Sequence, residues 1–567
     1  MESKAWGIDL GTTNSSIGHI VDGKPTAIPI QASPLVPSVV RYAEDGRAIV
    51  GREARNTAVL FPERTVRSVK RSMGKAGATF QIGGQHRTPQ EVSAEILREL
   101  IRGAEEATAQ RVDEAVITVP AYFNEAQRKA TLEASEQAGL SVLRLLSEPT
   151  SAALVYEQVS TRLYVQRPEN LLVYDLGGGT FDVSVLEVFE GAREVKAIAG
   201  DTALGGDDFD KKLVDLFLTH LPRDGARLED DRRAMCRLWR LAEEVKIKLS
   251  TDTEVRVREE IPFGSRTIPL ALTVSRRQLE AIISDLLNRT IDLAQKAVRD
   301  AGLKPEAIDQ ILLVGGSTRI PLVGQLIKSA FPAPIHGEID PDLCVSLGAA
   351  VQAGLLKGVR TDRILVDVAA HSLGTRVAHD LGERLETNRF AEIIPRNSVL
   401  PSRRAEEFYT LVDRQERVNV DVYQGESPKV EDNLFVGSFK FRLKPMPAGS
   451  PVHVEFSYDL NSLVHVRVNQ PGTENEKSAR FALSGGMKAA AAPVGKAADS
   501  DVAARARRLL VEVDVESRAK LEGVLSRWDG SVDPGKRKEA EDALLDLFLE
   551  IEGRSETLPS SSHAATR

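Results

Sequence analysis

The sequence has little of several features that define large classes of protein. It contains only two cysteines in 567 residues, Cys236 and Cys344, and their separation fits neither a disulfide framework nor a metal-ligand spacing. No apolar run reaches the length of about eighteen residues that a membrane-spanning helix needs. The first residues, Met1–Lys4, lead into a strand-like segment without an apolar signal region. We therefore expect a protein of the reducing cytoplasm that does not enter a membrane.

Charge and motif content exclude further classes. The formal net charge is -8, which argues against a nucleic-acid-binding protein. Neither the lysine-containing Walker loop nor the Rossmann glycine fingerprint is present. The apolar content of 42% and charged content of 28% are ordinary for a globular protein with large cores. A nucleotide site in this chain would therefore have to use other glycine turns.

One glycine-rich turn stands out near the middle of the sequence. Asp175–Asp182 contains Gly177, Gly178, Gly179 and Thr180 between an apolar run and an alternating run, which predicts two strands joined by a tight turn. Glycine lacks a Cβ atom, so backbone N–H groups in such a turn can face a bound anion. The flanking aspartates place negative charge where a hydrated cation could lie. The pattern fits a metal-bound phosphate, although many glycine-rich hairpins are only tight turns.

The same pattern occurs near the start of the chain. Gly7–Ser15 also contains aspartate, leucine, glycine and threonine in that order, and Asp9 and Asp175 lie 166 positions apart. A repeat of this length indicates two similar lobes, each presenting one hairpin to a shared cleft. Phosphates held between two hairpins, with a divalent cation near the aspartates, are a common arrangement in nucleotide sites.

Two more glycine turns lie between a strand and a helix. Leu204–Asp210 opens a helix whose N-terminus can receive phosphate oxygens, or it is an ordinary helix cap. In Leu313–Pro321, the guanidinium of Arg319 can stack on a planar ring. Four such turns on the strand ends of one α/β unit favour nucleotide binding.

The order of strand-like and helix-like segments predicts the fold class. Residues 5 to about 360 alternate between the two types, which is typical of an α/β domain, and residues 369–483 read as all-β. Two helical patterns follow at 499–528 and 534–552. In the α/β part we expect strands at 115–119 and 310–314, and helices at 90–109, 124–138 (capped by Asn124), 207–220, 232–249 and 275–301.

Together, these motifs resemble the DnaK-type 70-kDa heat-shock chaperones. The matching segments, in the family's order, are Gly7–Ser15, Val119–Asn124, Ser147–Ala153, Asp175–Asp182, Gly200–Asp210 and Gly315–Pro321. The resemblance implies an α/β, actin-like ATPase with two duplicated lobes, followed by an all-β sandwich and a short helical lid. The implied boundaries are 1–360 for the ATPase domain, 361–368 for the linker, 369–484 for the peptide-binding sandwich, 485–553 for the lid and 554–567 for a disordered tail.

The resemblance also assigns site residues. The catalytic residues would be Lys70, Glu148, Asp175 and Thr180, although Lys70 alone would be read as a solvated surface charge and Glu148 as a helix-capping charge. Asp9, Asp175 and Asp182 would organise Mg²⁺, its waters and a nearby K⁺. The ATP contacts would be Gly11, Thr12, Thr13, Asn14, Gly177, Gly178, Gly179, Thr180, Gly205, Gly206, Glu243, Lys246, Ser250, Gly315, Gly316, Ser317, Arg319 and Asp342. Without the resemblance, the helix face of Glu243, Lys246 and Ser250 would be read as an intrahelical salt bridge.

The function implied is an ATP-dependent molecular chaperone that acts in protein folding and the stress response. It would hydrolyse ATP by in-line attack of water and couple this to the capture and release of extended apolar peptides. The partners implied are a J-domain co-chaperone and a nucleotide-exchange factor, and the protein is expected to be a monomer. The peptide channel would be lined by Thr375, Ala378, Phe408, Leu411, Val418 and Val420.

Several departures from the family pattern are present. The loop between Gly74 and Thr88 is short, and Ala369, Ala370 and His371 replace a threonine-proline-leucine sequence. With the short lid, these features look most like the HscC-type subgroup. Three alternatives stay open: a sugar or glycerol kinase with the same hairpins, an actin-like filament former, and an ATP-switched regulator of particular client proteins.

Overall fold

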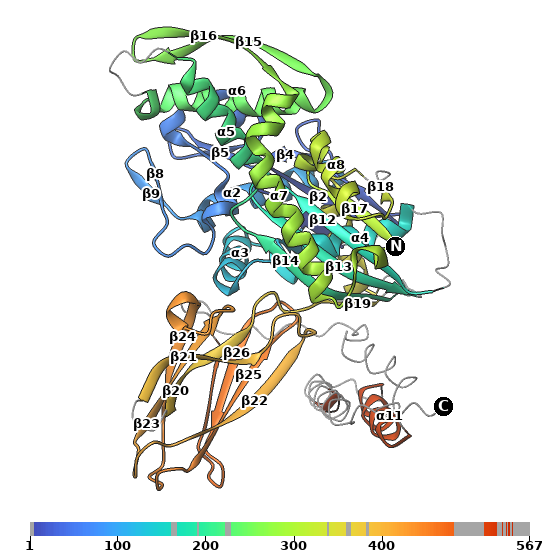
Figure 1. Cartoon of the computed structure of the whole chain (residues 1–567), viewed down its shortest axis with the longest axis vertical. Helices are drawn as coiled ribbons and strands as arrows, with labels where there is room; N and C mark the ends of the chain where they lie inside the picture. Colours follow the sequence, from blue (N-terminus) through green and yellow to red (C-terminus); the bar gives the residue numbers. More distant parts are fainter. Residues whose placement is uncertain are drawn as a thin grey trace, which may run out of the picture.

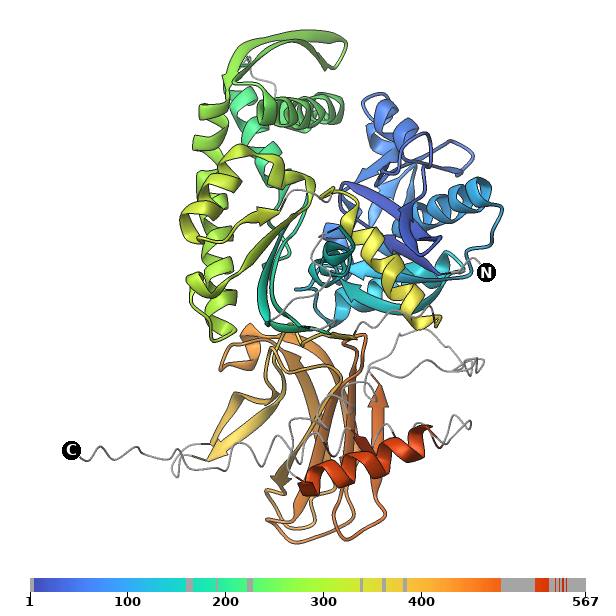
Figure 2. The same ribbon diagram turned by 90° about the vertical axis from the view of Figure 1, so that its right-hand side faces the viewer.

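The computed structural model places two α/β lobes next to an all-β domain (Figure 1). The structure describes residues 5–159, 167–189, 192–221, 228–336, 340–358, 364–380, 385–480 and 515–529, with Lys536, Ala540, Ala543, Leu544 and Leu547. Turned by 90°, the lobes lie side by side and the β domain lies beneath both of them (Figure 2).

Lobe I is built on a sheet with the strand order β11-β10-β1-β2-β3. β1 and β2 form an antiparallel hairpin, whereas β10 runs parallel to both β1 and β11. The strands of this sheet are β1 (Trp6–Asp9), β2 (Asn14–Val21), β3 (Lys24–Ala27), β10 (Glu114–Val119) and β11 (Ser141–Ser147), and β4 (Val36–Pro37) pairs with β2. Smaller elements cover it: β5 (Val39–Tyr42), β6 (Ala48–Val50), β7 (Thr65–Arg67), β8 (Phe80–Ile82), β9 (Gln85–Arg87), α1 (Arg52–Thr57) and the 3₁₀ turn η2 (Val69–Ser72).

Lobe II repeats this topology. Its sheet has the order β18-β17-β12-β13-β14-β19, in which β12, β13 and β14 are antiparallel neighbours and β17 runs parallel to β12 and β18. The strands are β12 (Glu169–Leu176), β13 (Phe181–Phe189), β14 (Ala192–Asp201), β17 (Gln310–Val314), β18 (Ile335–His336) and β19 (Ile364–Val366). The internal repeat predicted from the two hairpins is therefore confirmed as a repeat of sheet topology.

The predicted helices of the α/β part are present. They are α2 (Pro89–Thr108), α3 (Glu125–Gln137), α5 (Gly206–Thr219), α6 (Arg232–Thr251) and α7 (Arg276–Asp300). Asn124 caps α3 as expected, because its side chain accepts a hydrogen bond from Gln127 N. Further elements are α4 (Glu148–Val159), α8 (Pro321–Ala330), α9 (Cys344–Leu356), the hairpin β15 (Glu254–Phe263) and β16 (Arg266–Ser275), and the 3₁₀ turn η5 (Gly316–Arg319).

The lobes meet at the crossing of α4 and α9. Gly348 of α9 lies so close to Ser151 of α4 that a Cβ atom would overlap its backbone. Only glycine permits this approach, and α9 also packs on β1 and β10 of lobe I. Because α4 packs on β12 of lobe II, the crossing joins the two sheets.

The β domain is a sandwich of two four-stranded sheets, with the orders β21-β20-β23-β24 and β22-β25-β26-β27. Strictly alternating burial along β25 places Val452, Val454, Phe456 and Tyr458 in the core between the sheets. The bounds are β20 (Leu373–Asp380), β21 (Leu385–Ile394), β22 (Ser402–Tyr409), β23 (Arg417–Gln424), β24 (Leu434–Arg442), β25 (Pro451–Tyr458), β26 (Val464–Asn469) and β27 (Glu476–Arg480).

One helix of the predicted lid, α11 (Val515–Asp529), is described, and it overlaps the first helical pattern, ending one residue beyond it. Most of the second pattern, 534–552, and the tail 554–567 lie outside the described residues. Within the described part of the chain, none of the helices combines the length and apolar character needed to cross a membrane.

Candidate functional site

The two glycine hairpins meet between the lobes. Asp9 ends β1 and Asp175 lies near the end of β12, so each strand delivers a carboxylate to the turn that follows it. A Cβ atom on Gly178 would overlap the side chain of Thr13 in the opposite hairpin. The two turns are therefore in contact, and the repeat brings its carboxylates and N–H groups together.

The third glycine turn packs directly on the second. Gly206 N donates to Gly177 O at 3.0 Å, and Asp207 N donates to Gly178 O at 2.7 Å. A Cβ atom on Gly205 would lie 2.7 Å from the backbone of Gly178. The glycine at position 205 is thus required by close backbone approach, since its φ of -178° is open to any residue.

These turns border a cavity of about 320 Å³, which lies at the lower end of the size range of small-molecule sites. The predicted catalytic residues all line it. The other predicted residues in its wall are Asp9, Gly11, Thr12, Thr13, Asn14, Gly177, Gly178, Glu243, Lys246, Ser250, Gly315, Gly316, Ser317, Arg319 and Asp342. Gly179, Asp182, Gly205 and Gly206 do not line this cavity, although Gly205 and Gly206 pack against Gly178 and Gly177.

Lys70 and Glu148 form a buried ion pair at one end of the cavity. Lys70 Nζ donates to Glu148 Oε1 at 2.5 Å, and the residues are 5% and 7% exposed. Burial alone would lower the pKa of Lys70, but Glu148, Asp9 and Asp182 together raise it, so the ammonium form is retained. The reading of Lys70 as a solvated surface charge is wrong, because the η2 turn carries it inward.

Three aspartates gather beside this pair. Burial, followed by the negative charge of Glu148, raises the pKa of both Asp9 and Asp182 to about 7. The same two causes raise the pKa of Asp175, which faces Asp182 across the β12–β13 ladder. Acids crowded in this way favour a bound cation, which would lower all three pKa values.

The aspartates fit a hydrated ion better than a direct protein cage. Among the described residues, no group of three His, Cys, Asp or Glu side chains is arranged to ligate a metal. Mg²⁺ in nucleotide sites usually keeps several waters and takes its other ligands from one or two carboxylates and the phosphates. Asp9, Asp175 and Asp182 would hold such an ion largely through its waters.

The opposite end of the cavity carries the predicted ATP contacts on α6. Glu243 pairs with Arg55 of lobe I at 2.8 Å, and Lys246 pairs with Asp210 at 2.9 Å. The alternative of an intrahelical salt bridge is therefore wrong. Arg319 extends from η5 to within 2.8 Å of Asp342 with its side chain 52% exposed, so its planar face is open to a ring.

Sequence reasoning missed several wall residues. Ile247 is 57% exposed although it is a large apolar residue, which marks a surface available to a ligand ring. It lies four residues after Glu243 on α6, so helical spacing could have indicated it. The other missed residues are Leu35, Asp207, Asp210, Val314, Ile320, Pro341 and Val345.

The segment between the lobes and the β domain is part of the lobe II sheet. β19 pairs in parallel with β14, from Ala192 beside Ile364 to Glu194 beside Val366. Leu365 and Val366 are 3% and 6% exposed. The segment predicted as a linker therefore contains the edge strand of the lobe II sheet.

A chain of hydrogen bonds connects the aspartate cluster with the β domain. Asp182 Oδ1 accepts from Tyr122 N at 2.9 Å, and Tyr122 O accepts from His371 Nε2 at 3.1 Å. The rings of Tyr122 and His371 also meet edge to face at 4.5 Å. Tyr458 of β25 continues the chain by donating to His371 O at 3.3 Å. His371, one of the departures noted in the sequence, is thus buried at the centre of the junction.

Further contacts fix the β domain against both lobes. The guanidinium of Arg396 forms two hydrogen bonds to Asp300 of lobe II, at 2.6 and 3.0 Å. On lobe I, Glu125 N donates to Gln424 Oε1 at 3.0 Å, and Leu145 N donates to Asn461 Oδ1 at 2.9 Å. The junction therefore contains directional polar contacts to both lobes.

The predicted peptide-channel residues lie in different environments. Val420 is 3% exposed in the sandwich core, and Leu411 is 66% exposed. Thr375 is buried, and its hydroxyl donates a hydrogen bond to Asp421 O. Phe408 and Val418 are partly buried against the core, and the side chain of Ala378 lies outside the described residues. Beside Leu411, Tyr409 and Val412 are each 59% exposed, which gives the β22–β23 connection an apolar surface.

Comparisons with known proteins agree with this arrangement. A family model described as "Hsp70 protein" matches residues 5–564. The chain is 42% identical over 486 residues to the "Chaperone protein DnaK" of Thermotoga petrophila, covering 83% of this chain and 79% of the relative. The proteins of the same name from Thermotoga maritima and Thermotoga sp. strain RQ2 match to the same extent.

Proposed function

The chain belongs to the Hsp70 family of ATP-dependent chaperones, and from its two linked sites we propose how it works. ATP binds between the lobes, and its binding and hydrolysis control the capture and release of extended apolar peptide segments by the β domain. Family membership favours this function over a kinase, a filament former or a dedicated regulator.

ATP would occupy the cavity of about 320 Å³ with its phosphates at the glycine turns. The N–H groups of the two hairpins and the hydroxyls of Thr12, Thr13 and Thr180 would bind the phosphates. At the α6 end, Glu243, Lys246 and Ser250 would contact the ribose, and the base would lie between Ile247 and Arg319. Gly315, Gly316, Ser317 and Asp342 would complete the base contacts.

Hydrolysis would occur at the end of the cavity that holds Lys70 and Glu148. Lys70 would stabilise charge on the γ-phosphate and position the attacking water, and Glu148 would hold Lys70 in place through their 2.5 Å hydrogen bond. Mg²⁺ would neutralise phosphate charge, with its waters oriented by Asp9, Asp175 and Asp182. A K⁺ ion near the same aspartates belongs to this proposal.

The observation that carries the coupling is the chain from Asp182 through Tyr122 to His371. Asp182 belongs to the cation-binding cluster, and its carboxylate holds the backbone of Tyr122 at 2.9 Å. The carbonyl oxygen of Tyr122 in turn accepts a hydrogen bond from His371 Nε2 of the β domain at 3.1 Å. A change in the charge around Asp182 would therefore reach the β domain through one residue.

The β domain would bind peptides at its end that carries the exposed apolar residues Tyr409, Leu411 and Val412. A J-domain co-chaperone and a nucleotide-exchange factor would set the timing of the cycle, and the protein would act as a monomer. Both cysteines are free thiols, which agrees with a reducing cytoplasmic location.

The experiment compares ATP-triggered release of a fluorescent apolar peptide by the full chain and by His371→Ala. We expect ATP to accelerate release from the native chain at least about tenfold, and the variant to lose most of that acceleration while still hydrolysing ATP. His86→Ala, at an exposed position of lobe I, is the matched control. Equal acceleration in His371→Ala would contradict the coupling, and ATP-dependent phosphorylation of an added sugar or polyol would contradict the function.

A further inference from the structure

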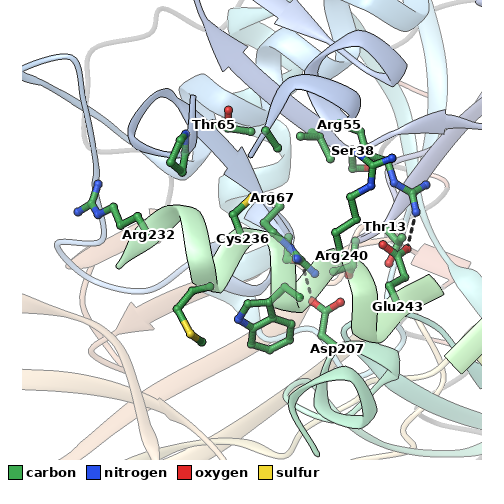
Figure 3. Close-up of a pocket in the computed structure, with 17 residues that line it drawn as sticks. Thr13, Ser38, Arg55, Thr65, Arg67, Asp207, Arg232, Cys236, Arg240 and Glu243 are labelled. Atoms are coloured by element: carbon green, nitrogen blue, oxygen red, sulfur yellow. Dashed lines mark hydrogen bonds and ion pairs between the residues drawn. The ribbon is translucent and has the colours of Figure 1, made fainter. Parts of the chain in front are cut away.

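A second cavity of about 290 Å³ lies beside the nucleotide cavity (Figure 3). The two share Thr12, Thr13, Asp207 and Glu243 in their walls, so they adjoin. None of the functions assigned above uses the rest of this second cavity.

Both lobes contribute to its wall. Lobe II provides one face of α6, because the positions 232, 235, 236, 239, 240 and 243 recur at helical spacing. From lobe I come residues of β5, α1, β7 and the connections between them: Ser38, Val39, Arg55, Ala58, Pro62, Thr65, Arg67 and Ser68. A molecule in this cavity would therefore touch both lobes at once.

Much of the lining is apolar and includes one large aromatic ring. The indole of Trp239, the thioether of Met235 and the ring of Pro62 supply flat, polarisable surface. The thiol of Cys236 adds to it, since burial raises its pKa and keeps it protonated. This lining suits a planar aromatic group.

Not every cationic side chain of the cavity forms an ion pair with a described carboxylate. Arg55 pairs with Glu243 at 2.8 Å, and Arg240 pairs with Glu244 at 2.9 Å. The carboxylate of Asp207 accepts from Ser68 Oγ at 2.6 Å. Arg67 is different: its guanidinium lies 5.0 Å from the centre of the Trp239 ring, and no described carboxylate lies within ion-pair distance of it. Arg232, at the opposite end of the cavity from Glu243, likewise has no described ion-pair partner (Figure 3).

An uncompensated guanidinium beside apolar surface is a recognition element for anions. Arg67 is partly buried, so its charge is incompletely solvated and would gain from an anionic partner. Its planar fork matches a carboxylate, phosphate or sulfonate group through two parallel hydrogen bonds. Arg232 reinforces the positive potential at the exposed end of the cavity.

We propose that this cavity is an effector site for a small planar aromatic anion. The aromatic ring packs among Trp239, Met235 and Pro62, and the anionic group pairs with Arg67. The cavity volume of about 290 Å³ limits the ligand to the size of one or two fused rings.

Binding at this site slows the release of nucleotide. The ligand contacts Arg67 of lobe I and Trp239 of lobe II, and separating the lobes would break one of these contacts. By linkage, a ligand that prefers the closed lobes stabilises the nucleotide between them, and the nucleotide strengthens ligand binding by the same factor. This consequence, unlike the site itself, rests on the proposed nucleotide function.

The site is tested by isothermal titration calorimetry of the full chain with 1-naphthoate and with neutral 1-naphthalenemethanol, in the absence of nucleotide. We expect naphthoate to bind the native chain at least about tenfold more tightly than the alcohol. Arg67→Gln and Trp239→Ala should each weaken naphthoate binding at least about tenfold, and Arg67→Lys should have an intermediate effect because it keeps the charge but loses the fork. Arg233→Gln, on the same helix but outside the cavity, should bind as the native chain does.

Equal binding of 1-naphthoate and 1-naphthalenemethanol would overturn the proposal. So would native-like naphthoate binding by Arg67→Gln and Trp239→Ala. The circular dichroism of each variant establishes whether it is folded. If Arg67→Gln is not folded, Arg67→Lys still tests the role of the guanidinium. The consequence is tested separately, by the release rate of a fluorescent ADP with and without naphthoate. Slower release supports it, and an unchanged rate at saturating naphthoate refutes it. Failure of the chain to bind ADP would contradict the proposed function and leave the calorimetric result standing.

Discussion

Glu125→Gln should strengthen the docking of the β domain on lobe I. Glu125 begins α3 and is 4% exposed at the junction, where its Oε1 accepts from Val464 N at 3.4 Å. Its other oxygen, Oε2, has no hydrogen-bond partner among the described residues. Burial, and then the charge of Asp459, raises the pKa of Glu125 from 4.5 to about 8 against the opposing effects of Val464 N, Arg128 and Lys129.

The direction of the pH effect follows from this shift. The docked state binds the proton more tightly than an undocked, solvated Glu125 with its ordinary pKa of 4.5. Docking is therefore favoured below pH 4.5 and is weakened progressively as the pH rises to about 8. At pH 7.5 the linkage relation gives a penalty on the order of 4 kcal/mol. Glutamine removes this penalty but leaves its amide imperfectly bonded, at a cost of about 1 to 3 kcal/mol. The net gain is on the order of 1 to 3 kcal/mol, or roughly 5- to 150-fold in the docking equilibrium.

Amide hydrogen exchange in β19 reports docking, because this strand pairs with β14 at the edge of the lobe II sheet. After correction for intrinsic exchange rates, native protection should fall between pH 6.5 and 8, whereas Glu125→Gln should be more protected and nearly independent of pH in this range. Glu136→Gln, at an exposed position of the same helix, should behave as the native chain does. Equal protection of Glu125→Gln and the native chain at pH 8 would refute the reasoning.

Three other variants test separate parts of the structure. Lys70→Ala removes the cation paired with Glu148 and should lower steady-state ATP turnover at least about a hundredfold while ATP binding stays measurable by calorimetry; turnover within about twofold of native would reject the assigned role. Gly205→Ala places a Cβ atom 2.7 Å from the backbone of Gly178 in the neighbouring glycine turn and should weaken ADP binding at least about tenfold. Gly324→Ala, with open space around it, should leave binding unchanged. Burial lowers the pKa of His371 below 6.5, with Tyr122 O and Glu426 opposing and Arg128 adding to the effect. Docking should therefore weaken as the pH falls from 6.5 through the docked pKa, and His371→Gln, which keeps an N–H donor but does not titrate, should lose this acid dependence in the same exchange experiment.

Local patterns in the sequence predicted most of the architecture. Gly177, Gly178 and Gly179 mark a turn because glycine alone offers an open backbone, and the repeat around Asp9 indicated a second lobe with the same hairpin. Helix α3 begins where Asn124 predicts it, since a cap acts within three residues of itself. Residues 369–483 likewise read as all-β, and the sandwich of β20 to β27 lies within them.

What the sequence concealed depends on partners distant in the chain. Glu243 could be expected to pair within its own helix, but lobe closure brings Arg55 to it across 188 positions. Lys70 looks like a surface charge until the fold places Glu148 beside it. The resemblance assigns Val420 to the peptide channel, and its side chain is 3% exposed in the sandwich core; a strand pattern alone does not say which face meets the opposite sheet. The sequence also does not reveal the contact between His371 and Tyr122, because Tyr122 belongs to lobe I and lies far from His371 in the chain.

The central claim, that nucleotide turnover between the lobes and peptide binding in the docked β domain are coupled, is tested most directly by peptide-stimulated ATP hydrolysis. Leu365 is 3% exposed in β19, so Leu365→Asp places a charge where docking buries an apolar side chain. We expect an extended apolar peptide to accelerate turnover several-fold in the native chain and to have no effect in Leu365→Asp, although the variant still hydrolyses ATP and binds the peptide. Equal stimulation of both proteins, or no stimulation of the native chain, would contradict the account.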